Sequence, residues 1–586
     1  MSPGRPGLAA AWRKSWRSGF TSSVVGGSVA LLTASNAFAQ PAPTVDAAQE
    51  QRRAQEREKA LREQLEATPD VRLRGEPESG QARLPASETP CFEIRSITLR
   101  GEGTAPQQFD WLLGTLAGPA TDDSPLGRCM GAQGIQLVLK RAQDALVARG
   151  FVTSRVLAEP QDLKSGSLAL TVLPGSIRAI RSAPGSNANP VPRNTAPVEP
   201  GTVLNLRDVE QTLENLKRVP TAEADIQIEP AELPGQSDLV VSYKQAFPLR
   251  LSLSADDSGS KGTGKYQGGL ALSWDNPLGL NDLFYVSFNG DLGGGDAGDR
   301  GTRGRTLHYS VPMGYWLLGA TASKSRYWQS VAGLSQSYVY RGTSHNAELK
   351  LSRLVYRDAV RKTTLSMGAF YRSSNNYIDD TEIEVQRRKV GGWQAALHHR
   401  EFIGQSTLDT TLAYKRGTGA FHALPAPEEA FGEGTSRFKL VTLDVALAAP
   451  FQLAQQKFRY NASVRAQANR SPLSPQDRFA IGGRYTVRGF DGNSSLVAER
   501  GWLLRNDLGV ALGNSGQELY AGLDHGEVSG PLAEFLSSRR LTGAVLGLRG
   551  SFKALTYDLF AGRPLEKPQG FVTARNTVGV SLNYSF

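Results

Sequence analysis

Between residues 247 and 586, hydrophobic and polar residues alternate in segments of roughly ten residues, the length of a transmembrane β-strand. About sixteen such segments follow one another, and no helical pattern persists among them. The connections are alternately short and long, as NPLGLN (276–281) and GDLGGGDAGDRGTRG (290–304) illustrate. This pattern predicts an antiparallel barrel of about sixteen strands over residues 247–586, with a soluble all-β protein as the alternative.

Two similar units precede the alternating region. FEIRSITLRG and GSIRAIRSAP each alternate as strands, and each is followed by a helical pattern and two further strands. The first helical pattern, GIQLVLKRAQDALVARG, ends at Gly150; the second, LNLRDVEQTLENLKRVP, starts near Asn205 and is closed by Pro220. The tandem recurrence predicts two related α+β domains, at 91–174 and 175–246.

A third pattern lies nearer the N-terminus, within residues 40–68. It is rich in helix formers and lacks glycine and proline from residue 46 to residue 67, and Leu61 and Leu65 are its only large aliphatic residues. A helix that is polar all round either lies in water or fills a polar cavity, and the pattern leaves both open. Pro69 ends the helix, and a linker rich in proline, glycine and charge follows at 69–90.

The first 39 residues combine a basic lead, the apolar run SSVVGGSVALLTAS and a small-x-small sequence ending at Ala39. These parts predict a secretory signal peptide, with a disordered N-terminus as the alternative. Export places the chain in an oxidising compartment. Its two cysteines, Cys91 and Cys129, are too few for a four-cysteine zinc site, so one structural disulfide is expected.

Composition narrows the functional classes. After the N-terminus no run of 18 apolar residues occurs, which argues against a helical membrane protein but not against a membrane barrel. The net charge is +10, yet 66 basic and 56 acidic residues are spread along the chain, so no nucleic-acid partner is expected.

Motifs for catalysis or metal binding are weak. Residues 293–298 fit G-x-G-x-x-G, but no helical pattern follows them. His398 and His399 are adjacent, so a strand would place them on opposite faces. No serine-elbow or Walker sequence is present. We therefore expect no enzymatic activity, no cofactor and no metal.

The last segment, VGVSLNYSF, places five large apolar residues on one face (Val578, Val580, Leu582, Tyr584 and Phe586). In a barrel this face would meet lipid, because the last strand pairs with the first. Ending in Phe586 after Tyr584, the segment resembles the terminal assembly signal of bacterial outer-membrane barrels. That resemblance implies recognition by the barrel-assembly machinery.

The whole arrangement resembles the transporters of two-partner secretion, the filamentous-haemagglutinin and haemolysin secretion/activation family. Three stretches carry the resemblance: CFEIRSITLRG with Cys91 and its partner Cys129 in GRC, LNLRDVEQTLENLKRVP, and DNPLGLND (275–282). The family implies two POTRA (polypeptide-transport-associated) domains in the periplasm, a transmembrane β-barrel in the bacterial outer membrane, and an N-terminal helix that plugs the pore.

Within GGRYTVRGFDGNSS (482–495), Val487-Arg488-Gly489-Phe490 resembles the superfamily's signature on its sixth external loop, which folds back into the barrel. An arginine in a polar lumen needs a carboxylate, and a planar guanidinium can hold one with two hydrogen bonds. The family's partner motif, an acidic residue followed by x-Gly, is matched by Asp524 and Gly526 in GLDHG. Gly522 stands where the family often has phenylalanine. The alternative is that Arg488 is a solvated loop residue.

The resemblance implies that the protein exports a large haemagglutinin- or haemolysin-like exoprotein, captured through the POTRA domains, while the barrel contacts outer-membrane lipid. Whether it also activates the exoprotein stays open. A barrel-assembly insertase is one alternative, although insertases typically carry more POTRA repeats and lack the plug helix. A passive porin is the other, although porins have no periplasmic repeats.

Overall fold

The computed structural model describes residues 47–66, 69–73, 82–101, 105–118, 120–186 and 194–586. The predicted signal peptide at 1–39 lies outside these residues, as do the start of the helix segment (40–46) and part of the linker (74–81). Within the described ranges, none of the helices is both long and apolar enough to cross a membrane.

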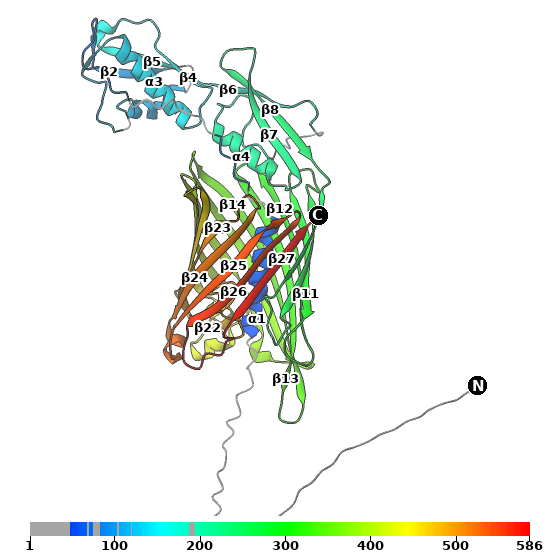
Figure 1. Ribbon diagram of the computed structural model, residues 1–586. Helices are drawn as coiled ribbons and strands as arrows, with labels where there is room; N and C mark the ends of the chain where they lie inside the picture. Colours follow the sequence, from blue (N-terminus) through cyan, green and yellow to red (C-terminus); the bar gives the residue numbers. More distant parts are fainter. Residues whose placement is uncertain (1–46, 67–68, 74–81, 102–104, 119, 187–193) are drawn as a thin grey trace, which may run out of the picture. The chain divides into compact units, whose positions relative to one another are not determined.

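The two N-terminal repeats share one topology, which confirms the predicted tandem of α+β units (Figure 1). Their three-stranded sheets are ordered β2–β5–β4 and β6–β8–β7, with the first strand parallel and the third antiparallel to the central last strand. The first repeat contains β1 (Phe92–Ile94), β2 (Ser96–Arg100), α2 (Ala105–Gln108), η1 (Asp110–Thr115), β3 (Arg128–Met130), α3 (Ala132–Ala148), β4 (Arg155–Leu157), η2 (Leu163–Ser165) and β5 (Ser167–Leu173). The second contains β6 (Ser176–Ser182), α4 (Leu206–Lys217), β7 (Ala222–Pro230) and β8 (Gln236–Gln245).

The second repeat illustrates how sequence fixes these elements. Helix α4 begins after Asn205, whose side-chain oxygen accepts the backbone N–H of Arg207 at 2.8 Å, as an N-cap residue does. Its apolar face, with Leu213 and Leu216, packs on the sheet through Val241. The N-cap and the apolar stripe therefore both follow from LNLRDVEQTLENLKRVP.

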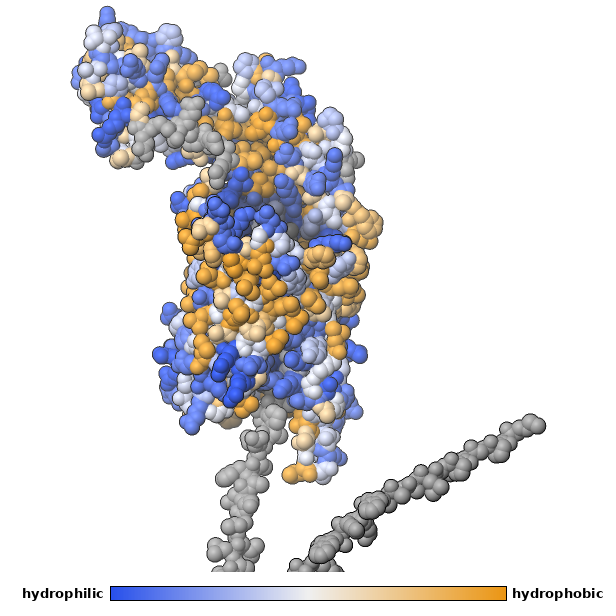
Figure 2. Space-filling model, in the orientation of Figure 1, coloured by the Kyte–Doolittle hydropathy of each residue, from blue (hydrophilic) through white to orange (hydrophobic). Residues whose placement is uncertain are grey.

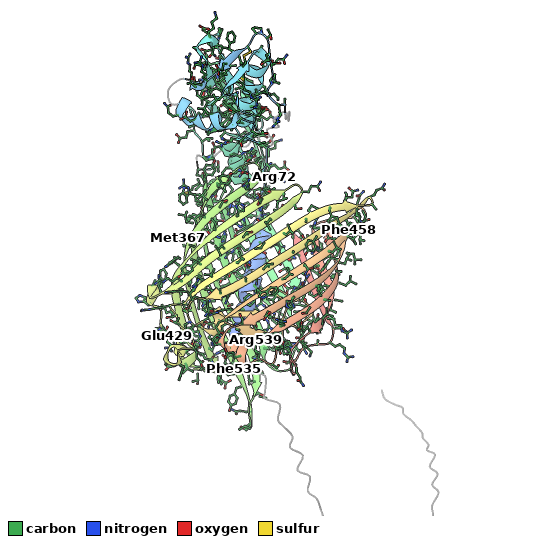
Figure 3. The ribbon with its side chains drawn as sticks, turned by 90° about the vertical axis from the view of Figure 1, so that its left-hand side faces the viewer. Arg72, Met367, Glu429, Phe458, Phe535 and Arg539 are labelled. Carbon is green, nitrogen blue, oxygen red and sulfur yellow. A yellow bond between two sulfur atoms is a disulfide. The ribbon has the colours of Figure 1, made fainter. Side chains whose placement is uncertain are left out.

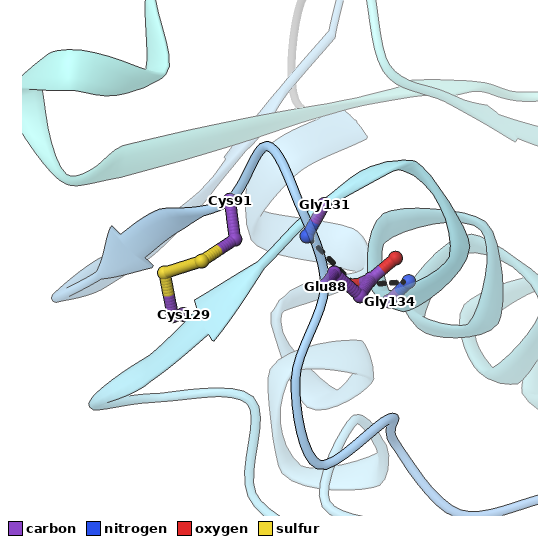
Figure 4. The surroundings of a disulfide bond; sticks show 5 residues. All are labelled: Glu88, Cys91, Cys129, Gly131 and Gly134. Carbon is purple, nitrogen blue, oxygen red and sulfur yellow. Dashed lines mark hydrogen bonds between the residues drawn. A yellow bond between two sulfur atoms is a disulfide. The ribbon is translucent and has the colours of Figure 1, made fainter.

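The predicted disulfide between Cys91 and Cys129 is confirmed, with 5.2 Å between the two Cα atoms (Figure 4). Beside it, the Glu88 carboxylate accepts three backbone N–H groups at the start of α3, from Gly131, Gln133 and Gly134. Desolvation works against the charged form of Glu88, but the three donors outweigh it and lower the pKa of this carboxyl. The disulfide and this cap bind the chain just before β1 to β3 and to the start of α3.

The barrel is closed and antiparallel, as predicted, and comprises sixteen long strands, with the two-residue β16 (Thr381–Glu382) as an extension beside β15. The first eight are β9 (Leu249–Asp256), β10 (Tyr266–Asp275), β11 (Leu283–Gly293), β12 (Arg300–Met313), β13 (Trp316–Ala332), β14 (Ser337–Arg357), β15 (Arg361–Ile378) and β17 (Arg388–Ile403). The others are β18 (Ser406–Thr418), β19 (Lys439–Leu453), β20 (Gln456–Asn469), β23 (Arg500–Ala511), β24 (Gln517–Ser529), β25 (Arg540–Phe552), β26 (Leu555–Glu566) and β27 (Thr577–Ser585). Closure joins β27 to β9, with Tyr584 opposite Leu253.

The two ends of the barrel differ. One end, here the turn end, carries short connections such as 404–405 and 454–455 and receives the chain from the second repeat. The other, here the loop end, carries long connections such as 419–438 and 470–499, which contain the short elements η4 (Ala420–His422), η5 (Pro427–Phe431), η6 (Pro475–Asp477), β21 (Phe479–Ile481) and β22 (Leu496–Ala498). Residues 290–304, expected to form a long loop, lie largely in strands, because β11 continues to residue 293 and β12 begins at residue 300.

Residues on the outside of the barrel form a hydrophobic belt. Figure 2 shows this belt on the face in view, with hydrophilic residues toward the loop end. Met367 on β15 is 61% exposed and points away from the wall (Figure 3). The C-terminal strand follows the predicted alternation, since Val578, Leu582 and Tyr584 are exposed while Thr577 and Gly579 are buried. Such a belt fits a hydrocarbon environment.

Helix α1 (Ala47–Leu65) lies inside the barrel, as Figures 1 and 3 both show. Its polar residues contact the polar inner wall. Glu50 accepts a hydrogen bond from Thr263 at 3.0 Å, and Arg62 donates to Thr321 at 3.3 Å. The sequence pattern left open whether this polar helix lies in water or fills a polar cavity. In the structure it fills a polar cavity, the lumen of the barrel.

Candidate functional site: an external loop bound to the barrel wall

Arg488 lies on the connection between β20 and β23 (470–499), and its side chain is 4% exposed. Its guanidinium holds both oxygens of Asp524 on β24: Nε donates to Oδ2 at 2.7 Å, and Nη2 donates to Oδ1 at 2.7 Å. The backbone N–H of Arg488 also donates to Asp524 Oδ2, at 2.9 Å. Three charge-assisted hydrogen bonds to one fully buried carboxylate fix both the position and the orientation of the loop.

A second carboxylate, which the sequence analysis did not single out, completes the surroundings of Arg488. Asp507 on β23 accepts from Arg488 Nη2 at 2.5 Å, and its other oxygen accepts from Arg549 Nη1 at 3.3 Å. Asp507 faces Gly522 across the β23–β24 pair. The alternation along β23 could have revealed it, because Asp507 shares a face with the buried Leu503.

Glycines allow the loop to approach the wall. Gly489 has a φ of +93°, and a Cβ there would lie 2.7 Å from the carbonyl oxygen of Arg563 on β26. On the facing strand, a Cβ at Gly562 would lie 2.9 Å from the Cα of Gly489. A Cβ at Gly522 would lie 2.4 Å from Asp507 Oδ1, 2.8 Å from the Asn506 carbonyl oxygen and 2.9 Å from Arg488 Nη2. The phenylalanine that the family often has at this last position therefore cannot be placed here without moving Arg488.

Val487 and Phe490 hold the loop through apolar contacts on either side of the ion pair. Both side chains are buried. Val487 lies against Gly526, where an added Cβ would be 3.0 Å from Val487 Cγ2, and the Phe490 ring meets Phe571 edge-on at 5.9 Å. Burial of side chains of this size contributes about 1.5–3 kcal/mol each. The buried members of the cluster are Phe479, Ile481, Val487, Phe490, Leu496, Ala498, Leu503, Val528, Ala533 and Leu541.

The N-terminal part of α1 contacts the same loop from the lumen. Gln49 Nε2 donates to the carbonyl oxygen of Gly492 at 2.8 Å, and Arg53 donates to the same oxygen. Arg52 Nη1 donates to the carbonyl oxygen of Pro475 at 2.7 Å. Two cavities of about 740 and 440 Å³, each lined in part by Arg488, lie beside the helix. Helix and loop thus occupy the lumen together and are hydrogen-bonded to each other.

A second buried arginine lies at the turn end. Arg357, at the end of β14, is 3% exposed at its side chain and donates to two carboxylates of α4: Nε to Glu210 at 2.9 Å and Nη2 to Glu214 at 3.0 Å. Arg357 Nη2 also donates to the carbonyl oxygen of Val71 at 2.6 Å, and Lys362 Nζ donates to Asp70 at 2.5 Å. The linker, the second repeat and the barrel therefore meet at one cluster of charges.

The glycine-rich stretch and the adjacent histidines, which the sequence analysis considered as weak motifs, lie in ordinary strand and loop positions. Residues 293–298 lie where β11 passes into the loop before β12. On β17, His398 Nδ1 lies 3.0 Å from Thr411 Oγ1, and His399 Nδ1 lies 2.8 Å from Thr363 Oγ1, so the two rings serve different neighbours. In the part of the chain that the structure describes, His, Cys, Asp and Glu form no group of three that could hold a metal ion.

A family model described as "Haemolysin secretion/activation protein ShlB/FhaC/HecB" matches residues 235–550. The chain belongs to this family. A POTRA domain model of the ShlB type matches residues 92–175 and a second POTRA model matches residues 176–230, so the two N-terminal repeats are POTRA domains. Family members are outer-membrane transporters of two-partner secretion, with the POTRA domains in the periplasm, which makes the turn end periplasmic and the loop end external.

Relatives match almost the whole chain. The outer membrane transporter CdiB-2 of Burkholderia pseudomallei (strain 1026b) is 37% identical, over 95% of this chain and 98% of the relative. The haemolysin transporter protein HpmB of Proteus mirabilis is 24% identical, over 66% of this chain and 68% of the relative. The solved structure of CdiB from Acinetobacter baumannii is similar with a TM-score of 0.80 and 29% identity, over 92% of this chain and 98% of that one.

Proposed function

We propose that this family member captures its exoprotein with the POTRA domains and passes it outward, unfolded, through the lumen that α1 and the external loop now occupy. The observation that carries the proposal is this joint occupancy by polar groups. Gln49, Arg52 and Arg53 hold the loop through hydrogen bonds to carbonyl oxygens, and other polar side chains of α1 bind the barrel through similar bonds. Exchanging such bonds for water costs about 1 kcal/mol each, so the helix can leave at modest cost.

The loop is held differently and has a different role. Three bonds from Arg488 to Asp524 and the burial of Val487 and Phe490 keep it on the wall. We expect the loop to rearrange when the helix leaves, while Arg488 stays bound to Asp524 on the barrel wall. No ATP is available in the periplasm, so we expect folding of the exported chain outside the cell to give transport its direction.

Capture in the periplasm follows from the sheet edges of the POTRA domains. The second sheet is ordered β6–β8–β7, so β7 is an edge strand, and it is the longest edge strand of the two repeats. An extended exoprotein segment can add there through backbone hydrogen bonds. Cysteine at Gln227 should then form a disulfide with a cysteine placed in the secretion domain of the exoprotein.

The barrel has two further partners in this proposal. Outer-membrane lipid contacts the hydrophobic belt, to which Val578, Leu582 and Tyr584 contribute. The barrel-assembly machinery recognises the C-terminal strand, ending at Phe586, before β27 pairs with β9. Truncation of Phe586 should therefore lower the amount of barrel in the membrane more than the activity of each barrel.

Secretion is the decisive assay. The chain is expressed in a bacterium with an outer membrane, together with the N-terminal secretion domain of the large exported protein encoded beside it, and the medium is assayed. Wild type should export; Arg488→Ala should not, at an equal amount in the membrane. Arg470→Ala is the matched control, because Arg470 lies on the same loop with an exposed side chain.

The outcomes separate the alternatives. Failure of folded wild type to export the correct neighbour would contradict the secretion proposal and favour an insertase or a channel. Equal export by wild type and Arg488→Ala would keep the transport function and remove the role of the Val487–Phe490 motif.

The class of exoprotein is a finer proposal. The CdiB-2 relative is matched over 95% of this chain, whereas the haemolysin transporter HpmB is matched over 66%. We expect the secretion domain of a CdiB partner to be exported more efficiently than that of a haemolysin. Equal export of both domains, measured side by side, would show that the transporter does not distinguish them.

A further inference from the structure

Five basic residues gather on the outside of the barrel, near its external end. Arg305 on β12 lies opposite Lys324 on β13, which lies opposite His345 on β14, and one step outward Arg303 lies opposite Arg326. We call these five residues the basic patch. Cross-strand neighbours of this kind have Cβ atoms about 4.5–5.5 Å apart and face the same side of the sheet.

The basic patch faces away from the lumen. Along β12 the exposed positions Arg303, Arg305 and Leu307 alternate with the buried Thr302 and Thr306 of the inner wall. The next outward-facing pair toward the periplasm is Leu307 and Ala322, which belongs to the hydrophobic belt. On β12 and β13 the patch therefore begins where the apolar surface ends, which fits the level of the outer-leaflet headgroups, while the exposed Phe288 of β11 lies opposite Arg305. Cations are tolerated there and costly nearer the bilayer centre.

Aromatic residues border the basic patch on its external side. Trp328 lies opposite Arg341 and Arg341 lies opposite Tyr377, with the Arg341 guanidinium 5.4 Å from the Tyr377 ring centre. The Arg303 guanidinium is 5.5 Å from the Trp328 ring centre. Tryptophan and tyrosine concentrate at membrane interfaces, so Trp328, two residues beyond Arg326 on β13, places the interface close to the patch on its external side.

The protein does not neutralise the basic patch. Among the described residues, none accepts a side-chain hydrogen bond or forms an ion pair with Arg303, Arg305, Lys324 or Arg326. The carboxylate of Asp299, nearby in the chain, accepts instead from the Trp328 indole at 3.1 Å. Like charges on directly opposite strand positions destabilise a sheet, so an external anion bound to these four cations in two adjacent rows would relieve their repulsion.

We propose that the basic patch binds the phosphate groups of the outer-leaflet glycolipid, lipid A of lipopolysaccharide. This rests on the outer-membrane location of the barrel. Lipid A presents two phosphates on a sugar whose acyl chains lie in the membrane, so the phosphates meet the two basic rows while the chains cover the adjoining Leu307 and Phe288 surface. Guanidinium groups suit phosphate because they donate paired hydrogen bonds. The barrel is thereby held at a fixed depth and rotation beside the β12–β14 wall.

The test uses the purified full chain in detergent and native mass spectrometry, with bisphosphorylated lipid A and the same lipid A without its phosphates as probes. Wild type should bind the phosphorylated form more tightly. The triple variant Arg305→Ala, Lys324→Ala, Arg326→Ala should lose this preference, with affinity falling roughly a hundredfold at about fivefold per charge. The control removes three basic residues near the periplasmic turns, Arg353→Ala, Lys457→Ala and Lys553→Ala, and should keep the preference.

Each other outcome overturns the proposal. Equal binding of both lipids by wild type would do so, as would an equal loss in the control. If the triple variant does not fold, the single Lys324→Gln replaces it, and an unchanged affinity there counts against the site. Cross-linking from position 305 to the emerging exoprotein, with no lipid captured, would assign the basic patch to the exported chain instead. Secretion is scored separately, so failure here leaves the transport function standing.

Discussion

Two buried arginines, Arg488 inside the barrel and Arg357 at its turn end, bind pairs of carboxylates in different ways. Arg488 and its two carboxylates, Asp524 and Asp507, bring an external loop onto the barrel wall. Arg357 brings together parts of the chain that are farther apart: the barrel rim, helix α4 through Glu210 and Glu214, and the linker. The first arginine binds a loop to its own domain. The second joins domains and holds the linker, through Val71, between α1 and the first repeat.

The difference between the two sites suggests a division of labour. The Arg488 site is reinforced by apolar burial and by glycines that allow close backbone contact, so it is built to persist. The Arg357 site is made of charges around a short stretch of linker, with Lys362 binding Asp70 and Glu214 as well. Such a site can release the linker when water and exoprotein compete for its charges. We expect the first site to be required for transport and the second to control how readily α1 leaves.

The largest effect is expected from Arg488→Ala. Removing one partner of a buried ion pair costs about 3–5 kcal/mol, because Asp524 is left buried with only the more distant Arg505, at 3.9 Å, as a counter-charge. Secretion should fall to background, measured as exoprotein in the medium at an equal barrel amount. Arg488→Lys should restore little, since an ammonium cannot make the paired bonds to Asp524. Full activity in the lysine variant would show that charge alone suffices.

Arg357→Ala should change the resting pore more than the transport. Loss of the bonds to Glu210, Glu214 and Val71 frees the linker, so the linker no longer helps to keep α1 in the lumen. Single-channel recordings in planar bilayers should show more frequent open events than wild type, with secretion retained. Arg353→Ala is the matched control, because Arg353 lies four residues earlier on β14 and faces outward over Trp316. Unchanged conductance would remove the proposed difference between the two sites.

A smaller effect separates the two carboxylates of Arg488. Arg488 donates three hydrogen bonds to Asp524 and one to Asp507. Asp507→Asn should therefore cost the Arg488 site about 1.5–3 kcal/mol, the value of one bond to a charged group, and should also weaken the bond from Arg549; Asp524→Asn should cost the site more. The measurement is the labelling rate of a cysteine at Ser494 on the same loop. Equal rates in both variants would mean that the two carboxylates contribute equally.

Gly489→Ala tests the close approach of loop and wall. A non-glycine residue at a φ of +93° is strained by about 1–2 kcal/mol, and its Cβ would meet the Arg563 carbonyl at 2.7 Å. We expect partial loss of secretion. Gly492→Ala is the control for strain alone, because it has a φ of +77° but its Cβ would meet no atom closer than 3.8 Å. Equal losses would show that backbone strain, and not wall contact, matters.

The smallest effect on transport is expected from removing the disulfide. Replacing Cys91 and Cys129 by serine should lower the free energy of unfolding of the first repeat by roughly 4 kcal/mol, for a sequence separation of 38 residues. Neither arginine site touches this bond, so pore conductance should be unchanged. Limited proteolysis of the first repeat and bilayer recordings measure the two effects separately. A change in conductance would couple the first repeat to the pore.

The sequence predicted features that depend on neighbouring residues or on a family motif, but not other contacts between residues that are distant in the chain. The start of the second helix near Asn205, the alternation of the C-terminal strand and the Arg488–Asp524 partnership were all visible, because short motifs and periodicity carry them. Asp507 and the Arg357 cluster were not. Arg357, Glu210 and Asp70 are widely separated in the chain, and although Glu210 lies within LNLRDVEQTLENLKRVP, no local pattern links it to the other two.

By itself, the sequence determined the order of parts: a polar helix, two repeats of one topology, and a barrel whose strands alternate to the last residue. Those features follow from local periodicity and from composition, which act over a few residues. Only the tertiary structure decided where the polar helix lies, which second carboxylate holds Arg488, and that unpaired cations from β12 and β13 form one outward surface. These depend on the register and closure of the sheet, which bring distant residues side by side and which no local pattern encodes.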